Sequence, residues 1–188
     1  GVVNHIRISS EGPDSITIEW NGPEDSGGIE VLGYSILRGI SPGGMKELTT
    51  STTPIFIDQN IVPGITYYYS VKARNQEGYG KASNIVEASS KTTPEAVKGL
   101  RSEVASDEVI LKWEEPSFDG GFEVTGYHVY RSVDGGDREL IDQLDENAVG
   151  FKDRSVSAGV YRYSVVATNE MGEGDSSFID ADVPSRSL

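Results

Sequence analysis

The chain has 188 residues with 30 acidic and 16 basic side chains, which gives a formal net charge of -14. Such an excess of negative charge argues against nucleic acid and anionic membranes as partners. No apolar run reaches the ~18 residues of a membrane span, so we expect no membrane insertion. The absence of cysteine excludes disulfides, cysteine-based zinc sites and thiol nucleophiles. The chain does not begin with Met, so we expect a piece of a longer protein with flanking domains.

Short segments with a two-residue alternation of apolar and polar side chains follow one another along the first half. Ile16, Ile18 and Trp20 alternate with Thr17 and Glu19. Such alternation buries one face of a strand. Further strands are predicted at residues 31–37, 67–75 and 85–88, with turns at 42–44 and 63–64.

The second half has the same kind of pattern. Strands are predicted at residues 109–113, 124–130, 161–169 and 178–181, with a turn at Gly135-Gly136. No segment keeps the i, i+3, i+4, i+7 spacing of an amphipathic helix over a helical length. The sequence therefore predicts an all-β protein, with about seven short strands in each half.

The two halves are copies of one another. Trp20-x-x-Pro23 recurs 93 residues later as Trp113-x-x-Pro116, and Tyr67-x-Tyr69-x-Val71 recurs 94 residues later as Tyr161-x-Tyr163-x-Val165. The slip of one residue means that one loop differs in length between the copies. Because proline cannot continue a central strand, Pro94 marks the boundary. We expect two domains, residues 1–93 and 94–188, each a seven-stranded Greek-key β-sandwich.

Charge is divided unevenly between the copies. Residues 1–93 hold 10 acidic and 7 basic side chains, whereas residues 94–188 hold 20 and 9. The surfaces have therefore diverged while the apolar pattern stayed the same.

Residues for catalysis or metal binding are sparse. The two histidines, His5 and His128, have no evident nucleophile partner, so we predict no enzyme activity and no cofactor. Asp119, Asp134 and Asp137 lie in predicted turns and are the calcium candidates, because calcium binds six to eight oxygens. The alternative is a solvated acidic surface with ordinary Asp-Gly turn chemistry.

Three large apolar side chains fall in predicted loops and are the candidates for contacting a partner: Phe118, Tyr79 and Met171. Scattered exposed apolar residues are also ordinary. The nearby glycines Gly78, Gly80, Gly172 and Gly174 are interpreted as positions that need a positive φ.

Both copies resemble fibronectin type III domains. The resemblance is carried by Trp followed by Pro in an early strand, by a Gly-Gly…Gly-Tyr entry to the next strand, and by Ile61-x-Pro63-Gly64-Ile65-Thr66-Tyr67. It implies an immunoglobulin-like sandwich in which Tyr67 forms a corner, with its hydroxyl bonded back to the backbone. The second copy departs from this motif, because Val156-x-Ala158-Gly159-Val160-Tyr161 is one residue shorter and has Ala in place of Pro.

Details such as Arg38-Gly39-x-Ser41-Pro42 resemble modules of secreted or surface-attached prokaryotic proteins. That resemblance implies a spacer or adhesion module of an extracellular or cell-surface multidomain protein. The short junction Thr92-Thr93-Pro94 offers few free residues, so we expect it to restrict the angle between the copies, and we expect a monomer. A second hypothesis is a module that binds a basic protein or a glycan through loops of the acidic second copy. A third is a module of an intracellular array.

Overall fold

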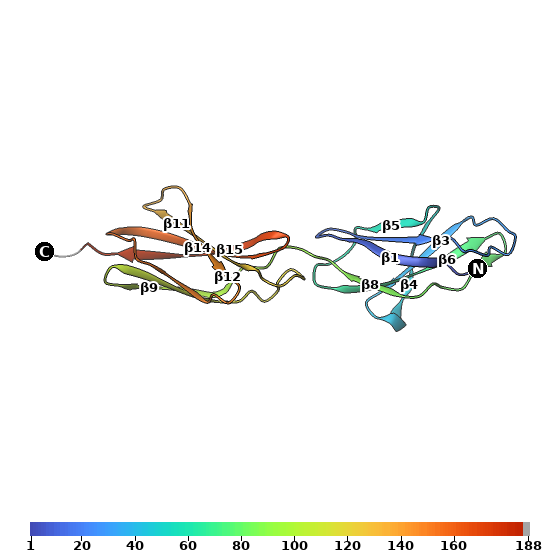
Figure 1. Cartoon of the computed structure of the whole chain (residues 1–188), viewed down its shortest axis with the longest axis horizontal. Coiled ribbons are helices and arrows are strands. Elements are labelled where there is room, and N and C mark those ends of the chain that lie inside the picture. Colours follow the sequence, from blue (N-terminus) through green and yellow to red (C-terminus); the bar gives the residue numbers. More distant parts are fainter. Residues whose placement is uncertain (186–188) are drawn as a thin grey trace. The chain divides into compact units, whose positions relative to one another are not determined.

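The computed structural model describes residues 1–185 and divides the chain into two compact units, Gly1–Lys91 and a second unit that begins at Thr92 (Figure 1). Strands make up the regular structure of both units, which confirms the predicted all-β class. The one helical segment among the described residues is a short 3₁₀ turn, η1 (Pro42–Gly44). Residues 1–185 contain no helix that is long and apolar enough to cross a membrane.

The first unit consists of two antiparallel sheets. One sheet has the order β1-β2-β5 and contains β1 (Asn4–Glu11), β2 (Ile16–Asn21) and β5 (Ile55–Asp58). In the other sheet β3 (Gly33–Gly39) lies between β4 (Lys46–Ser51) and β6 (Thr66–Asn75). The free side of β6 pairs with two short segments, β7 (Gly78–Tyr79) and β8 (Val86–Ser89). The chain crosses between the sheets after β2, after β4 and after β5, as in a Greek-key sandwich.

The second unit repeats this strand order. Its smaller sheet has the order β13-β10-β9, with β9 (Lys98–Ala105), β10 (Glu108–Glu114) and β13 (Gly150–Asp153). Its larger sheet has the order β12-β11-β14-β15, with β11 (Gly126–Val133), β12 (Glu139–Asp145), β14 (Gly159–Asn169) and β15 (Gly172–Val183). The last strand is continuous here, whereas in the first unit it is split into β7 and β8.

Each unit has its own apolar core, built as the alternation predicts. Ile16, Ile18 and Trp20 are at most 2% exposed in the first unit, and Val109, Leu111 and Trp113 are equally buried in the second. Each Trp packs against the Tyr at the second position of the next strand, with ring centroids 5.3 Å apart for Trp20 and Tyr34 and 5.6 Å apart for Trp113 and Tyr127. Burial of such side chains contributes roughly 1.5–3 kcal/mol each.

The chain enters each sandwich at one end and leaves it at the other. In the first unit Gly1 packs against the backbone of Asp25, in the loop after β2, while Lys91 N–H donates to the Gly12 carbonyl in the β1–β2 turn. In the second unit Thr92 N–H donates to the Gly120 carbonyl, before β11, and β15 ends opposite Gly159. Successive residues, Lys91 and Thr92, are therefore each bonded to the backbone of their own unit.

Candidate functional site

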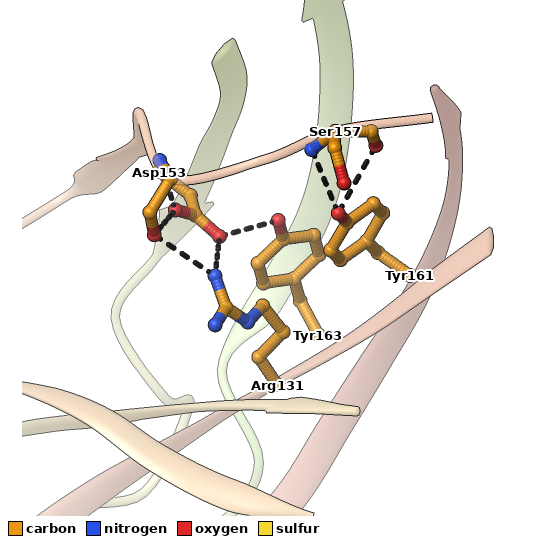
Figure 2. Close-up of polar contacts among 6 residues, drawn as sticks. Arg131, Asp153, Ser157, Tyr161 and Tyr163 are labelled. Atoms are coloured by element: carbon orange, nitrogen blue, oxygen red, sulfur yellow. Dashed lines mark hydrogen bonds and ion pairs between the residues drawn. The ribbon is translucent and has the colours of Figure 1, made fainter. Parts of the chain in front are cut away.

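The most strongly connected polar group of the second unit surrounds Asp153, at the end of β13 (Figure 2). Its carboxylate is 3% exposed. Oδ2 accepts from Arg131 Nη1 at 2.8 Å and from the Tyr163 hydroxyl at 2.7 Å. Oδ1 accepts from the Ser155 N–H at 3.0 Å and from the Ser155 hydroxyl at 2.8 Å. Both carboxylate oxygens are thus fully satisfied, as a buried charge requires.

These contacts determine the ionisation states of Asp153 and Tyr163. Burial acts to raise the pKa of Asp153, but the hydrogen bonds from Arg131, Ser155 and Tyr163 outweigh it and lower the pKa below the usual value of an aspartate. Burial and the hydrogen bond to Asp153 raise the pKa of Tyr163. The result is a carboxylate and a phenol that do not exchange protons near neutral pH, which suits a structural tie rather than acid–base chemistry.

The first unit contains the same group. Asp58 Oδ2 accepts from Arg38 Nη1 at 2.7 Å and from the Tyr69 hydroxyl at 2.8 Å, and Oδ1 accepts from the Asn60 N–H at 3.0 Å. Sequence reasoning missed both groups. Arg38 and Arg131 are 93 residues apart, but Asp58 and Asp153 are 95 apart, so a comparison at one fixed offset does not align them.

Beside each of these groups lies a tyrosine corner, as the resemblance implied. The Tyr67 hydroxyl accepts from the Val62 N–H at 3.0 Å. In the shorter motif the Tyr161 hydroxyl accepts from the Ser157 N–H at 2.9 Å and also donates to the Ser157 carbonyl at 3.0 Å (Figure 2). The loss of one residue and of the proline therefore moves the backbone partner but keeps the corner.

The three calcium candidates lie at two ends of one strand. Asp119 precedes β11, whereas Asp134 and Asp137 follow it, and the eight residues of β11 extend over about 25 Å. The Asp119 carboxylate caps the Gly121 N–H at 2.8 Å, and the Asp134 carboxylate accepts from the Val160 N–H at 2.8 Å. Among residues 1–185 no three His, Asp or Glu side chains form a group that could hold a metal ion.

Two of the three partner-binding candidates lie on neighbouring loops of the second unit. Asn169 joins these loops: its side-chain amide donates to the carbonyls of Asp119 and Thr92, each at 2.8 Å, and its Oδ1 accepts from the Met171 N–H at 2.8 Å. Met171 is 41% exposed, while Phe118 is half-buried. Phe118 lines a hollow of about 460 Å³ whose ionisable lining residues are all acidic: Glu115, Asp119, Glu123 and Glu146.

The third candidate, Tyr79, is 51% exposed in the other unit, on β7. The interpretation that four nearby glycines all need a positive φ is wrong for two of them. Gly78 and Gly172 do have positive φ, of 130° and 121°, but Gly80 and Gly174 do not. A Cβ at Gly80 would lie 2.5 Å from the Gly1 carbonyl oxygen, and one at Gly174 would lie 2.0 Å from that of Pro94. Those two glycines allow the first residues of each unit to approach the sheet closely.

His128 has partners that the sequence did not reveal. Its Nδ1 lies 2.5 Å from Glu173 Oε1, and the Tyr130 hydroxyl donates to the same oxygen. Hydrogen bonds from Tyr130 and His128 lower the pKa of Glu173. Val166 on β14 lies directly opposite His128 on β11, and it is only 2% exposed although it is not part of the apolar core cluster.

Comparisons with known proteins agree with this architecture. The family model of the fibronectin type III domain matches residues 1–89. The chain is 26% identical over 168 residues to a Kelch domain-containing protein of Saccharolobus solfataricus, covering 89% of the chain and 22% of the relative. It is 29% identical over 180 residues to the striated-muscle M-protein of Gallus gallus, covering 90% of the chain and 12% of the relative.

Among solved structures, a segment of two fibronectin type III domains from chicken tenascin aligns with 96% of the chain and 99% of that segment, at 16% identity and a TM-score of 0.46. The chain spans 22% or less of the length of the two curated relatives.

Proposed function

We propose that the protein is a non-catalytic spacer or adhesion module of an extracellular multidomain protein. The first unit belongs to the fibronectin type III family, and the second unit repeats its strand order. The observation that carries the proposal is the path of the chain. Each sandwich is entered at one end and left at the other, and Lys91 and Thr92 are bonded to backbone in different units with no free residue between them. The function of such a path is to keep flanking domains apart.

The absence of cysteine allows a direct test of the spacer. Cysteines introduced at the exposed Glu24 and Asp137 can be labelled with a dye pair, and the width of the distance distribution can be measured by single-molecule energy transfer. We expect a narrow distribution, which broadens when a ten-residue Gly-Ser linker is inserted between Lys91 and Thr92. A natural junction as broad as the inserted one would contradict the proposal.

A second candidate function is recognition of a basic protein by loops of the second unit. The hollow beside Phe118 supports it, because four carboxylates line that hollow and Met171 lies exposed on the adjoining turn. Binding of a lysine-rich peptide that weakens with salt and is lost on Glu115→Gln with Glu123→Gln would support this function. The control is the double variant Asp142→Gln with Glu139→Gln. Equal binding by this control and by the Glu115→Gln, Glu123→Gln variant would contradict this second candidate function.

An intracellular array remains the alternative to an extracellular location. The striated-muscle M-protein is one relative of this chain, and it favours the array. The discriminating observation is the sequence that flanks residues 1 and 188: a secretion signal or a surface anchor supports the extracellular proposal, and further modules without either support the array.

A further inference from the structure

Three basic side chains gather on the outer face of the smaller sheet of the second unit. Lys112 on β10 lies directly opposite Arg101 on β9 and Gly150 on β13. Lys152, two residues after Gly150 and on the same face, lies opposite Ile110. These residues line a hollow of about 360 Å³, together with the exposed Val149. No acidic residue lines this hollow, which we call the basic hollow.

The first unit shows what the same face looks like without such a hollow. There Glu19 takes the place of Lys112 and forms an ion pair with Arg7, its partner across the ladder. Ile55 takes the place of Gly150, and Ile57 that of Lys152. The equivalence is fixed by matching backbone bonds, from Trp20 N–H to the Pro54 carbonyl and from Trp113 N–H to the Val149 carbonyl.

Within the described part of the second unit no direct ion pair offsets the charge of these three side chains. Like charges directly opposite one another on a sheet destabilise it. The unit has only 9 basic side chains against 20 acidic ones, yet three of the nine are placed together. Glu103 and Glu114 share this face by register, but among residues 1–185 no carboxylate forms an ion pair with Arg101, Lys112 or Lys152. Three cations placed together without a direct ion pair make this hollow electropositive, and such a surface favours an anionic partner.

We propose that the basic hollow binds an acidic, extended segment of a partner protein. The strand β13 is an edge of its sheet, so one side of its backbone is open to a further strand. In an extended segment, side chains on one face recur every ~7 Å, which is the spacing of successive residues on the same face of this sheet. Alternate acidic side chains of an added strand would therefore lie beside Lys152 and Lys112.

The lining of the hollow favours a peptide over a glycan. Sugar rings are bound by stacking on exposed aromatic faces, but the aromatic residues here are Trp113, which is 2% exposed, and Phe151, which is half-buried and packs against the core. The apolar surface that is available comes from Ile110 and Val149, which suit aliphatic side chains of an alternating acidic and apolar peptide.

The test uses the whole chain and two synthetic peptides of one composition, four alternating Glu-Val pairs and a block of four Glu followed by four Val. The variant Arg101→Gln with Lys112→Gln and Lys152→Gln is compared with a control of equal charge, Lys98→Gln with Arg138→Gln and Arg154→Gln, whose side chains lie outside the hollow. Fluorescence anisotropy of the labelled peptides gives the affinities. We expect salt-sensitive binding of the alternating peptide that falls ~10-fold or more in the first variant and less than ~2-fold in the control.

A second variant separates binding from folding. Lys112→Glu places the acidic residue of the first unit opposite Arg101, so it should leave the melting temperature of the second unit unlowered while it abolishes binding. The proposal is overturned if neither peptide binds at millimolar concentration, if the control loses as much affinity, if the block peptide binds equally well, or if a sulfated polysaccharide is preferred. Self-association that the first variant removes would replace the partner with a second copy of this chain.

Discussion

Arg38, Asp58 and Tyr69 in the first unit are joined by the same hydrogen bonds as Arg131, Asp153 and Tyr163 in the second. The outer faces of the two smaller sheets differ, because the Arg7–Glu19 ion pair of one is replaced by the basic hollow of the other. A buried charged group has few arrangements that satisfy every polar atom, so both copies keep the same one. An exposed pair contributes little to stability, so its position is free to change with function.

The largest expected effect concerns the core tryptophans. Trp113→Ala should destabilise the second unit by ~3–5 kcal/mol, because it empties a site that is 2% exposed. Each unit contains one Trp, so the fluorescence of Trp20 reports the unfolding of the first unit alone. In urea we expect its midpoint to stay unchanged while circular dichroism shows an earlier second transition. An equal shift of the Trp20 signal would show that the units unfold together, and the milder Trp113→Phe keeps the test usable if the Ala variant does not fold.

Removal of the buried aspartate should destabilise either unit about as strongly as Trp113→Ala destabilises the second unit. Asp153→Ala and Asp58→Ala each leave a half-buried arginine and a tyrosine hydroxyl without their partner, and we expect losses of ~3–5 kcal/mol in the free energy of unfolding. The matched control is Asp180→Ala, which breaks the exposed pair with Arg162 and should change nothing measurable. A loss confined to one unit would show that the two groups are not equivalent.

The same carboxylate predicts how stability depends on pH. Because the pKa of Asp153 is lower in the folded state than in the unfolded one, its contribution is complete above the unfolded pKa of about 4 and is lost as the pH falls through the folded pKa. Urea unfolding between pH 6 and pH 2 should show the second unit weakening below about pH 4. Asp153→Ala should flatten this part of the curve, and an unchanged slope in that variant would assign it to other carboxylates.

Much of the fold could be predicted from the sequence, because strand burial follows a local two-residue alternation. The strands around Trp20 and Trp113 are of this kind, whereas the corner at Tyr67 was implied by the resemblance to fibronectin type III domains. The ties around Asp58 and Asp153 depend on residues that are adjacent only after folding, and their spacing differs between the copies. The basic hollow was missed for the same reason, since Arg101, Lys112 and Lys152 come from three strands.

A smaller effect should distinguish the two corners. Tyr161→Phe removes two hydrogen bonds, one from the Ser157 N–H and one to the Ser157 carbonyl, whereas Tyr67→Phe removes the bond from the Val62 N–H. We expect a loss of ~1–2 kcal/mol for Tyr161→Phe and ~1 kcal/mol for Tyr67→Phe, because a single bond contributes about 0.5–1.5 kcal/mol. Thermal unfolding of each variant measures the difference, and a larger loss at Tyr67 would mean that the proline-containing turn depends more strongly on its corner.

The smallest expected effect is at Tyr127, whose hydroxyl is buried without a hydrogen-bond partner among the described residues. Burial and the nearby Glu115 raise its pKa, so the phenol stays neutral. Tyr127→Phe removes a polar atom that has lost its contact with water, while the ring keeps its packing on Trp113, so stability should stay level or rise by less than ~1 kcal/mol. Tyr163→Phe is the matched comparison, because the same change there removes the bond to Asp153 and should lower stability by ~1–2 kcal/mol. A loss at Tyr127 equal to the loss at Tyr163 would show that its hydroxyl binds an internal water, and would place a polar contact in the core of the second unit next to its tryptophan.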